Sequence, residues 1–493
     1  MSKLHKIIMS SLLLGSVALT ACEDFLDVNE NPNYPKSVGV DIVTPSGQGT
    51  VAYIMGNQFQ VAGNFWAQHF SQSLVANQYK NLDKYQITES GYDGPWQTLY
   101  AGALNDFKYV KDRAKGDSVN YAAMAGIMQA YTFQVLTDGF DKVPFTDALK
   151  GLGNTSPKFD EGPVVYDGII KLIDDAVAQI NDDNEIVHDE DLVFQGDMEK
   201  WRRFANTLKL RVYIRQIYAR PEVSEAGIRA LYASGAEFLE ADEDASVQFE
   251  GTTSRSNPLY QTDVTGTTAN NIAASQTIID YLVETQDPRI DYLFQHPGAT
   301  PNPNSPHRGI QQGLAGIVGA PTTALTSFSR PNYQTGGIFA KNAPVILMSG
   351  VESLFLQAEA AARGLATGAT AKSLYEQAIT ASFNKAGVTD AAEVNAFLEG
   401  EMVDYDNTSD LESKIDRIIT QKWVALGGTQ GFEIWSELRR TGYPSFIEPS
   451  ISSILPDGVI ANRFLYPLSE SQRNPNYPGL VRAEVPVWWD KRN

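Results

Sequence analysis

Aromatic and amide side chains alternate between Trp66 and Trp96. This stretch contains Gln72, Asn77, Gln78, Tyr79, Asn81, Tyr85 and Tyr92. Aromatic rings can receive the C–H face of a sugar, and amides form hydrogen bonds with its hydroxyl groups. The pattern therefore indicates a site for a neutral, polar ligand, with Trp66, Tyr79, Tyr85 and Tyr92 as candidates for stacking and Asn77 as a candidate for hydrogen bonding.

A second set of candidates lies in a segment rich in Thr, Ser, Asn, Gly, Gln and Pro, about 251–345. Such a long loop-rich region in a helical chain is either functional or a small subregion of its own. Arg330 and Asn332 are the polar candidates here, beside Tyr333. Only Ile272–Glu284 has a helical pattern in this region.

Catalytic and metal-binding patterns are weak. The histidines, His5, His69, His188, His296 and His307, form no His-x-x-x-His pair, and Cys22 is the only cysteine, so we expect no metal site and no cofactor. Gly313, Gly316 and Gly319 lack the flanking strand and Lys of a phosphate loop, and no Gly-x-Ser-x-Gly motif occurs. Numerous carboxylates leave a glycosidase pair possible, although the acidic runs are typical of solvated surface.

The formal net charge of −20 argues against nucleic acid as a partner, because an acidic surface repels phosphate groups. A basic cluster interrupts this acidity between Lys200 and Arg220. We expect these cations to pair with carboxylates of neighbouring helices. Trp201, Trp423 and Trp435 lie on strongly periodic segments and are predicted to be core residues, as is Trp96, which is four residues from Tyr100.

The N-terminus has the pattern of an export signal: Lys3 and Lys6 precede a short apolar run, which ends at Leu19-Thr20-Ala21-Cys22. These last residues resemble a bacterial lipobox, which implies a signal peptide over 1–21 and lipidation of Cys22. Acyl chains would hold the protein at a membrane that the polypeptide does not cross. The Asn- and Pro-rich stretch from Asp24 to about Gly49 predicts a non-helical leader.

Helical periodicity dominates the rest of the chain. Apolar residues recur at spacings of three and four in 351–383, with Gly364 and Gly368 between two helices, as in a tetratricopeptide hairpin. Further pairs are predicted at 96–113 with 119–136 and at 164–181 with 200–219. A single hairpin cannot bury its apolar face, so we expect these pairs to stack in one domain, 22–493, with a mainly α fold.

Several segments together resemble the SusD/RagB family of outer-membrane nutrient-binding lipoproteins. They are Cys22–Asn29, Val143–Leu149, Asp287–Ile290, Glu352–Gly364, Gly431–Pro444, Arg463–Glu470 and Asn474-Pro475. The resemblance implies a helical, SusD-like body that binds without catalysis and acts as the lid of a SusC-like TonB-dependent transporter in Bacteroidetes. It also implies that shared motifs are structural, with Arg439 and Arg440 tying helix ends to carboxylates and Asp287-Pro288-Arg289 ending a helix.

The resulting hypothesis is a lipoprotein at the outer-membrane surface that binds oligosaccharides. A RagB-like peptide-binding protein is the main alternative. A surface glycoside hydrolase and a scaffold that binds only proteins also remain open.

Overall fold

The computed structural model describes residues 38–267 and 269–491. The chain divides into two units, Met1–Gly39 and Val40–Asn493, and the second, which is compact, contains nearly all of the described residues. The predicted signal peptide, the predicted lipidation site Cys22 and most of the leader lie outside the described residues. The end of the leader was predicted wrongly, because helix α2 (Val40–Ile54) already begins at Val40 and buries Val51, Ala52 and Ile54 in the core.

The second unit is mainly helical, which confirms the predicted fold class. Its longer helices are α2, α6 (Asn105–Arg113), α7 (Val119–Phe140), α8 (Gly162–Val177), α9 (Met198–Arg215), α10 (Pro221–Ala233), α14 (Gly350–Ala362), α15 (Ala371–Lys385), α17 (Leu411–Ala425) and α18 (Gly431–Thr441). Its other helices are α3 (Gln60–Trp66), α4 (Lys80–Asp83), α5 (Asp93–Gln97), α11 (Pro258–Tyr260), α12 (Gln276–Glu284), α13 (Ile290–Leu293), α16 (Ala391–Leu398) and α19 (Leu468–Arg473). Three π-helical turns interrupt the helices: η1 (Met55–Phe59), η3 (Thr98–Leu104) and η7 (Gln261–Thr265).

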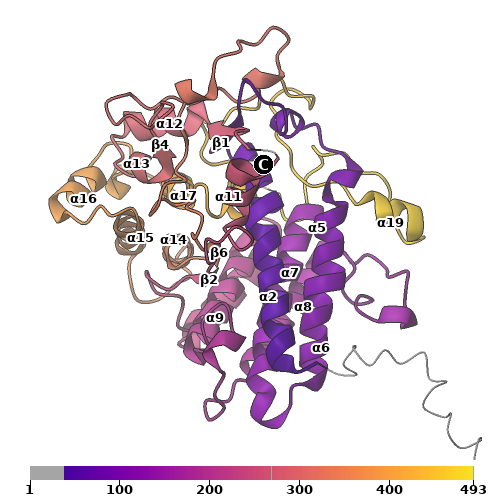
Figure 1. The fold of residues 1–493 in the computed structure, drawn as a ribbon. Helices are drawn as coiled ribbons and strands as arrows, with labels where there is room; N and C mark the ends of the chain where they lie inside the picture. The colour runs from indigo at the N-terminus through magenta and orange to yellow at the C-terminus, as the bar shows by residue number, and fades with distance from the viewer. Residues whose placement is uncertain (1–37, 268, 492–493) are drawn as a thin grey trace, which may run out of the picture. The chain divides into compact units, whose positions relative to one another are not determined.

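The predicted helical pairs are present. Helices α14 and α15 pack together, and each begins at a hydroxyl cap, Ser349 or Thr370, whose side chain accepts a backbone N–H of the first turn. Gly364, at φ +68°, follows α14 in a conformation that favours glycine. Helices α2, α6, α7 and α8 run side by side (Figure 1). This stacking of tetratricopeptide-like pairs buries the faces that single hairpins would expose.

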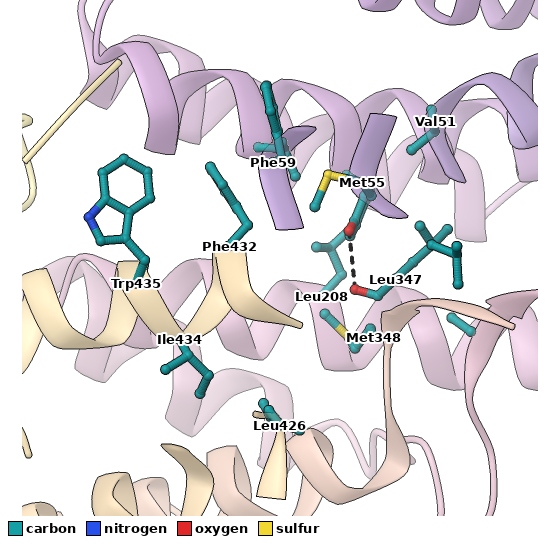
Figure 2. Close-up of a cluster of buried hydrophobic side chains, with 14 of the residues drawn as sticks. Val51, Met55, Phe59, Leu208, Leu347, Met348, Leu426, Phe432, Ile434 and Trp435 are labelled. Carbon is teal, nitrogen blue, oxygen red and sulfur yellow. Dashed lines mark hydrogen bonds between the residues drawn. The ribbon is translucent and has the colours of Figure 1, made fainter. Parts of the chain in front are cut away.

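The core joins segments far apart in the chain. Figure 2 shows Phe432 and Trp435 of α18 directed toward Phe59 of η1, with Ile434 on the other side of α18 near Leu426. The rings of Phe59 and Phe432 stack at 5.3 Å. Helices α3 and α18 can approach closely because Gly63 has no Cβ atom. A Cβ atom at this position would lie only 2.2 Å from the backbone carbon of Gly431. The glycine therefore sets how close these helices can come.

The loop-rich region from 251 to 345 contains short strands that the sequence did not predict. Strand β3 (Ile272–Ala274) pairs antiparallel with β1 (Phe70–Gln72), and β4 (Phe294–Gln295) pairs with β5 (Arg330–Pro331). Strand β2 (Ala245–Val247) pairs with β6 (Val345–Met348). The predicted helix Ile272–Glu284 begins only at Gln276, capped by Ser275, because the first residues pair with β1.

Cations of α9 enter a network of buried charges, as the internal-pairing hypothesis predicted. Arg215, with no side-chain exposure, pairs with Glu437 at 2.7 Å and with Asp138 at 3.4 Å. Five cations and five carboxylates form what we call the buried ion network. Its members are Arg211, Arg215, Arg363, Lys422 and Arg440 with Asp138, Glu352, Glu359, Glu433 and Glu437. Burial favours the neutral carboxyl, but Arg440, Lys422 and Arg215 together hold the pKa of Glu437 well below its usual value.

The shared motifs are structural, with one difference from the prediction. Arg440 pairs with Glu359 at 2.6 Å as expected. Arg439 instead donates to two backbone carbonyls, those of Asp138 at 2.7 Å and Asn462 at 2.9 Å, and its guanidinium lies 3.5 Å from the centre of the Trp435 ring. Trp96, Trp201, Trp423 and Trp435 are buried, as predicted. Among the described residues, no helix combines the length and apolar character that a membrane span requires.

Candidate ligand-binding site

An open cleft of about 420 Å³ lies beside η1, α4 and η7. This volume falls within the usual range for ligand pockets, roughly 300–1,000 Å³. Amide side chains dominate the polar lining, and none of the lining residues is charged. The cleft is lined by Asn57, Gln58, Val61, Gln78, Tyr79, Asn81, Leu82, Gln86, Ile87, Thr88, Gly91, Tyr92 and Thr262.

The π-helical turn η1 places Asn57 and Gln58 at the cleft. It continues α2 directly into α3, with helical dihedral angles at both Ile54 and Gln60. Such turns within helices often occur at functional sites, because the extra residue changes the direction of the following side chains. On the buried side, a Cβ atom at Gly56 would lie 2.3 Å from Val345, so Gly56 allows η1 to pack against β6.

The segment from Gln72 to Gln86 forms the adjacent wall. Gln72 Oε1 accepts the backbone N–H of Tyr79 at 2.6 Å, and Asn271 Oδ1 accepts that of Gln78 at 3.0 Å. Two buried amides thus fix the backbone of the wall from behind. Gln78 and Asn81, which belong to this wall, are exposed, so their side chains are accessible from solvent.

Tyr79 is the stacking candidate that the structure places in the cleft. Its side chain is half-buried, and its ring packs against Phe65 at 5.3 Å with an interplanar angle of 52°. Contact with Phe65 limits the motion of the ring, which lowers the entropy lost when a ligand packs on it. Asn77 is exposed but does not line the cleft; the next residue, Gln78, does.

The other stacking candidates are core residues, which corrects the prediction. Trp66 has 0% exposure, donates its indole N–H to the Leu82 carbonyl at 3.1 Å and packs on Trp435. Tyr85 is 1% exposed, and its hydroxyl accepts the Ser450 N–H at 3.2 Å. A fully buried ring cannot present its face to a sugar, so neither residue is a stacking platform.

Tyr92 has an intermediate position. It borders the cleft, but its side chain is 6% exposed and its ring stacks on Phe464 at 4.0 Å. Burial raises the pKa of Tyr92. One ring face is therefore used in the core, and Tyr92 shapes the cleft without offering a stacking surface.

Arg330, Asn332 and Tyr333 make internal hydrogen bonds. Arg330 and the Tyr333 hydroxyl both donate to the buried carboxylate of Asp263, at 3.1 and 2.8 Å, and Asn332 donates to the Asp291 carbonyl. Asp263 lies in η7 next to the cleft residue Thr262. Arg330 and Tyr333 therefore support the cleft wall from behind, which is a different role from the predicted ligand contact.

Sequence reasoning missed Asn57, Gln58, Gln86 and Thr262. A signal for two of them exists in the sequence: Asn57 and Gln58 are adjacent amides inside a largely apolar helical segment, where uncompensated polar groups would be costly to bury. Thr262 comes from the loop-rich region, about 180 residues further along the chain, so no local pattern connects it with Tyr79.

The cleft and the helical body define a class of protein: a mainly α, tetratricopeptide-like binding protein with an uncharged, amide-lined site. Residues 43–467 match the SusD-like family described as "Starch-binding associating with outer membrane". The chain belongs to this family, which confirms the predicted membership. Among curated proteins, none matches the chain in sequence.

Solved structures share the fold over nearly their whole length. A SusD homologue from Bacteroides vulgatus has a TM-score of 0.78 at 20% identity, covering 91% of this chain and 97% of its own. A chitin-binding protein has a TM-score of 0.75 at 25% identity, covering 91% and 100%. A chitin-binding SusD homologue from Flavobacterium johnsoniae has a TM-score of 0.74 at 24% identity, covering 90% and 98%.

Proposed function

We propose that this protein is a lipid-anchored receptor at the outer-membrane surface, which captures oligosaccharides in the cleft at Tyr79 and passes them unchanged to a SusC-like TonB-dependent transporter. The observation that carries the proposal is the lining of the cleft: amides around one half-buried tyrosine, with no charged side chain. Family membership and the chitin-binding proteins of the same fold support a glycan as the ligand.

The uncharged lining suits a neutral sugar. The chain has a net charge of −20, so the absence of carboxylates from this cleft is a local property of the site. Sugar hydroxyls both donate and accept hydrogen bonds, and an amide side chain offers both functions. A charged ligand would find no counterion among the lining residues and would lose its hydration without compensation.

The same lining speaks against hydrolysis in the cleft. A glycosidase usually needs two carboxyl groups about 5–10 Å apart, one on each side of the scissile bond. No lining residue carries a carboxyl group. We therefore expect that maltohexaose or chitohexaose incubated with the protein is recovered at its original length.

Isothermal titration with maltooligosaccharides and chitooligosaccharides tests the ligand class. We expect saturable binding of at least one series. Binding of extended peptides, with no heat from either sugar series, would replace the glycan proposal by the RagB-like one.

Cleft variants test the site. Removal of one hydrogen-bonding amide in Gln58→Ala should weaken binding about 2- to 10-fold, from a contribution of about 0.5–1.5 kcal/mol. Tyr79→Ala should weaken it about 10-fold or more, with loss of ring contact. Tyr53→Ala is the matched control, because Tyr53 is an exposed tyrosine of α2 outside the cleft lining. Unchanged affinity in both cleft variants would refute this location.

The membrane anchor is tested separately. Cys22→Ala removes the thiol that the lipid would modify, so we expect the protein to leave the membrane fraction and to lose labelling by a fatty-acid analogue. Full retention of the variant in the outer membrane would contradict the lipid anchor without affecting the binding proposal.

A further inference from the structure

Asp291, His296 and His307 converge at the edge of the β4 and β5 pair. One ligand atom of each lies within 4.8 Å of the others. Nε2 of His296 is 2.9 Å and Nε2 of His307 is 2.8 Å from Asp291 Oδ1. The two imidazole rings lie beside each other, with 4.1 Å between their centroids. Both histidines thus present the same ring nitrogen to one carboxylate oxygen.

Hydrogen bonds on the far side of each ring fix these orientations. His296 Nδ1 lies 2.7 Å from the Ser305 carbonyl oxygen, and His307 Nδ1 lies 2.9 Å from the Ser329 hydroxyl. Histidines that bind metals usually have such a partner at the second nitrogen, because it fixes the tautomer and the ring direction. The structure therefore holds the partners expected around metal ligands, as well as the ligands.

The hydrogen bond to Ser305 has a direct consequence. A carbonyl oxygen only accepts, so His296 Nδ1 must carry a proton. In the neutral ring Nε2 then presents a lone pair toward Asp291 Oδ1 at 2.9 Å. Two acceptors at this distance require a proton or a metal ion between them.

The backbone around the three residues is fixed. Asp291 belongs to α13, and His296 directly follows β4, which pairs with β5 through Phe294 opposite Pro331. The Asn332 backbone donates to the Leu293 carbonyl at 2.9 Å, and its side chain donates to the Asp291 carbonyl. These contacts join α13 to the end of β5, so two of the three ligands belong to one braced unit.

We propose that Asp291, His296 and His307 bind one zinc ion. Zinc accepts imidazole and carboxylate ligands at about 2.0–2.2 Å, and a tetrahedral arrangement separates such ligands by roughly 3.3 Å. The observed separations of 2.8 and 2.9 Å from Asp291 Oδ1 need to widen by only about 0.5 Å. Asp291 is 66% exposed, so solvent reaches the site and a water molecule can complete the coordination.

The bound ion would connect the loop between His296 and His307 with α13. Metal binding to a site that the unfolded chain lacks stabilises the folded state. The site adds no step to ligand capture, and it neither depends on nor supports the glycan proposal. It lies within the loop-rich region, where the short strand pairs give little stability of their own.

The test uses the mature chain without a polyhistidine tag, stripped of metal and dialysed. We expect one equivalent of zinc by elemental analysis after loading, and a zinc titration with a single site. Zinc at 100 times its Kd should raise the ratio of folded to unfolded protein about 100-fold and should raise the unfolding temperature. Cobalt in the same site should give the intense visible bands of four-coordinate geometry, a readout that needs no variant.

Variants identify the ligands. Asp291→Asn changes an exposed side chain, so this variant should fold normally. Asp291→Asn and His296→Gln should each weaken zinc binding about 100-fold or more. His188→Gln is the control, because His188 is exposed and lies 3.0 Å from Asp189 but belongs to no such triad among the described residues. Absence of stoichiometric zinc in the unmodified chain, or equal binding by the control and both ligand variants, would overturn the proposal.

Discussion

Asp83 is a buried carboxyl whose ionisation the fold opposes. It ends α4, the helix that supplies Asn81 and Leu82 to the cleft, and it has 0% exposure. Burial raises the pKa of Asp83 from 3.8 to about 7, although the Gly313 N–H, at 3.0 Å from Oδ2, acts in the opposite direction. The raised pKa means that the folded protein holds a proton that the unfolded chain releases.

The sign of the pH dependence follows from this difference. Between pH 4 and pH 7 the folded state binds more protons than the unfolded state, so this carboxyl lowers the free energy of unfolding as the pH rises. Each unit of pKa difference corresponds to about 1.4 kcal/mol, so the loss by pH 8 is on the order of 4 kcal/mol. The contribution of Asp83 is therefore largest in acid and is lost at alkaline pH.

Asp83→Asn removes the titration and keeps the shape. Gln312 donates its amide to Asp83, while Gln312 Oε1 has no hydrogen-bond partner. Rotation of the Gln312 amide would let this oxygen accept the new amide N–H, and the Gly313 N–H would keep an acceptor. The variant should therefore keep one hydrogen bond to Gln312 and the bond from the Gly313 N–H, while the ionisable group is removed.

Chemical denaturation at pH 5, 6, 7 and 8 measures the effect. We expect Asp83→Asn, if it matches the unmodified protein at pH 5, to be more stable at pH 8 by about 3 kcal/mol, because the two pKa units between pH 5 and pH 7 each contribute about 1.4 kcal/mol. Asp175→Asn, at an exposed ion pair with Lys171, is the control and should leave the pH slope unchanged. If Asp83→Asn is less stable at pH 8, or keeps the original slope, the reasoning about burial is wrong.

Other parts of the fold give predictions that the same denaturation assay can check. Glu437→Gln leaves an excess positive charge in the buried ion network and should lower the free energy of unfolding by about 3–5 kcal/mol. The exposed control Asp175→Asn should lower it by less than about 1 kcal/mol, and equal losses would contradict the network. Gly63→Ala should cost about 2 kcal/mol or more, because the added methyl group meets backbone at 2.2 Å, whereas Gly94→Ala, with open space around it, should change stability by less than about 1 kcal/mol. Trp66→Ala should cost about 3–5 kcal/mol as a core truncation; a stable variant that has lost only ligand affinity would restore Trp66 as a contact.

Local sequence patterns predicted the helices well. The spacing of apolar residues in α14 and α15 and the glycine between them specify a hairpin wherever it lies in the fold, because helix periodicity is a property of neighbouring residues. The strands β1 and β3 were missed for the opposite reason. Each is three residues long, and each becomes a strand only by pairing with a segment about 200 residues away.

The candidate site shows the same limit. The alternating rings and amides between Trp66 and Trp96 lie in the segment that forms one wall of the cleft. Which of these rings point outward depends on packing: Trp66 meets Trp435 and Tyr92 meets Phe464, both from the C-terminal third of the chain. The triad of Asp291, His296 and His307 also lacks a local spacing, because a loop and a strand pair bring its members together.

The sequence by itself determined the helical class and the family, since periodicity and ordered motifs are properties of residues and their neighbours. The tertiary structure alone decided which rings are buried, that Thr262 joins Tyr79 across the cleft, and that His296 and His307 face one carboxylate. Burial and proximity depend on contacts between segments far apart in the chain, and these contacts exist only when all the segments are folded together.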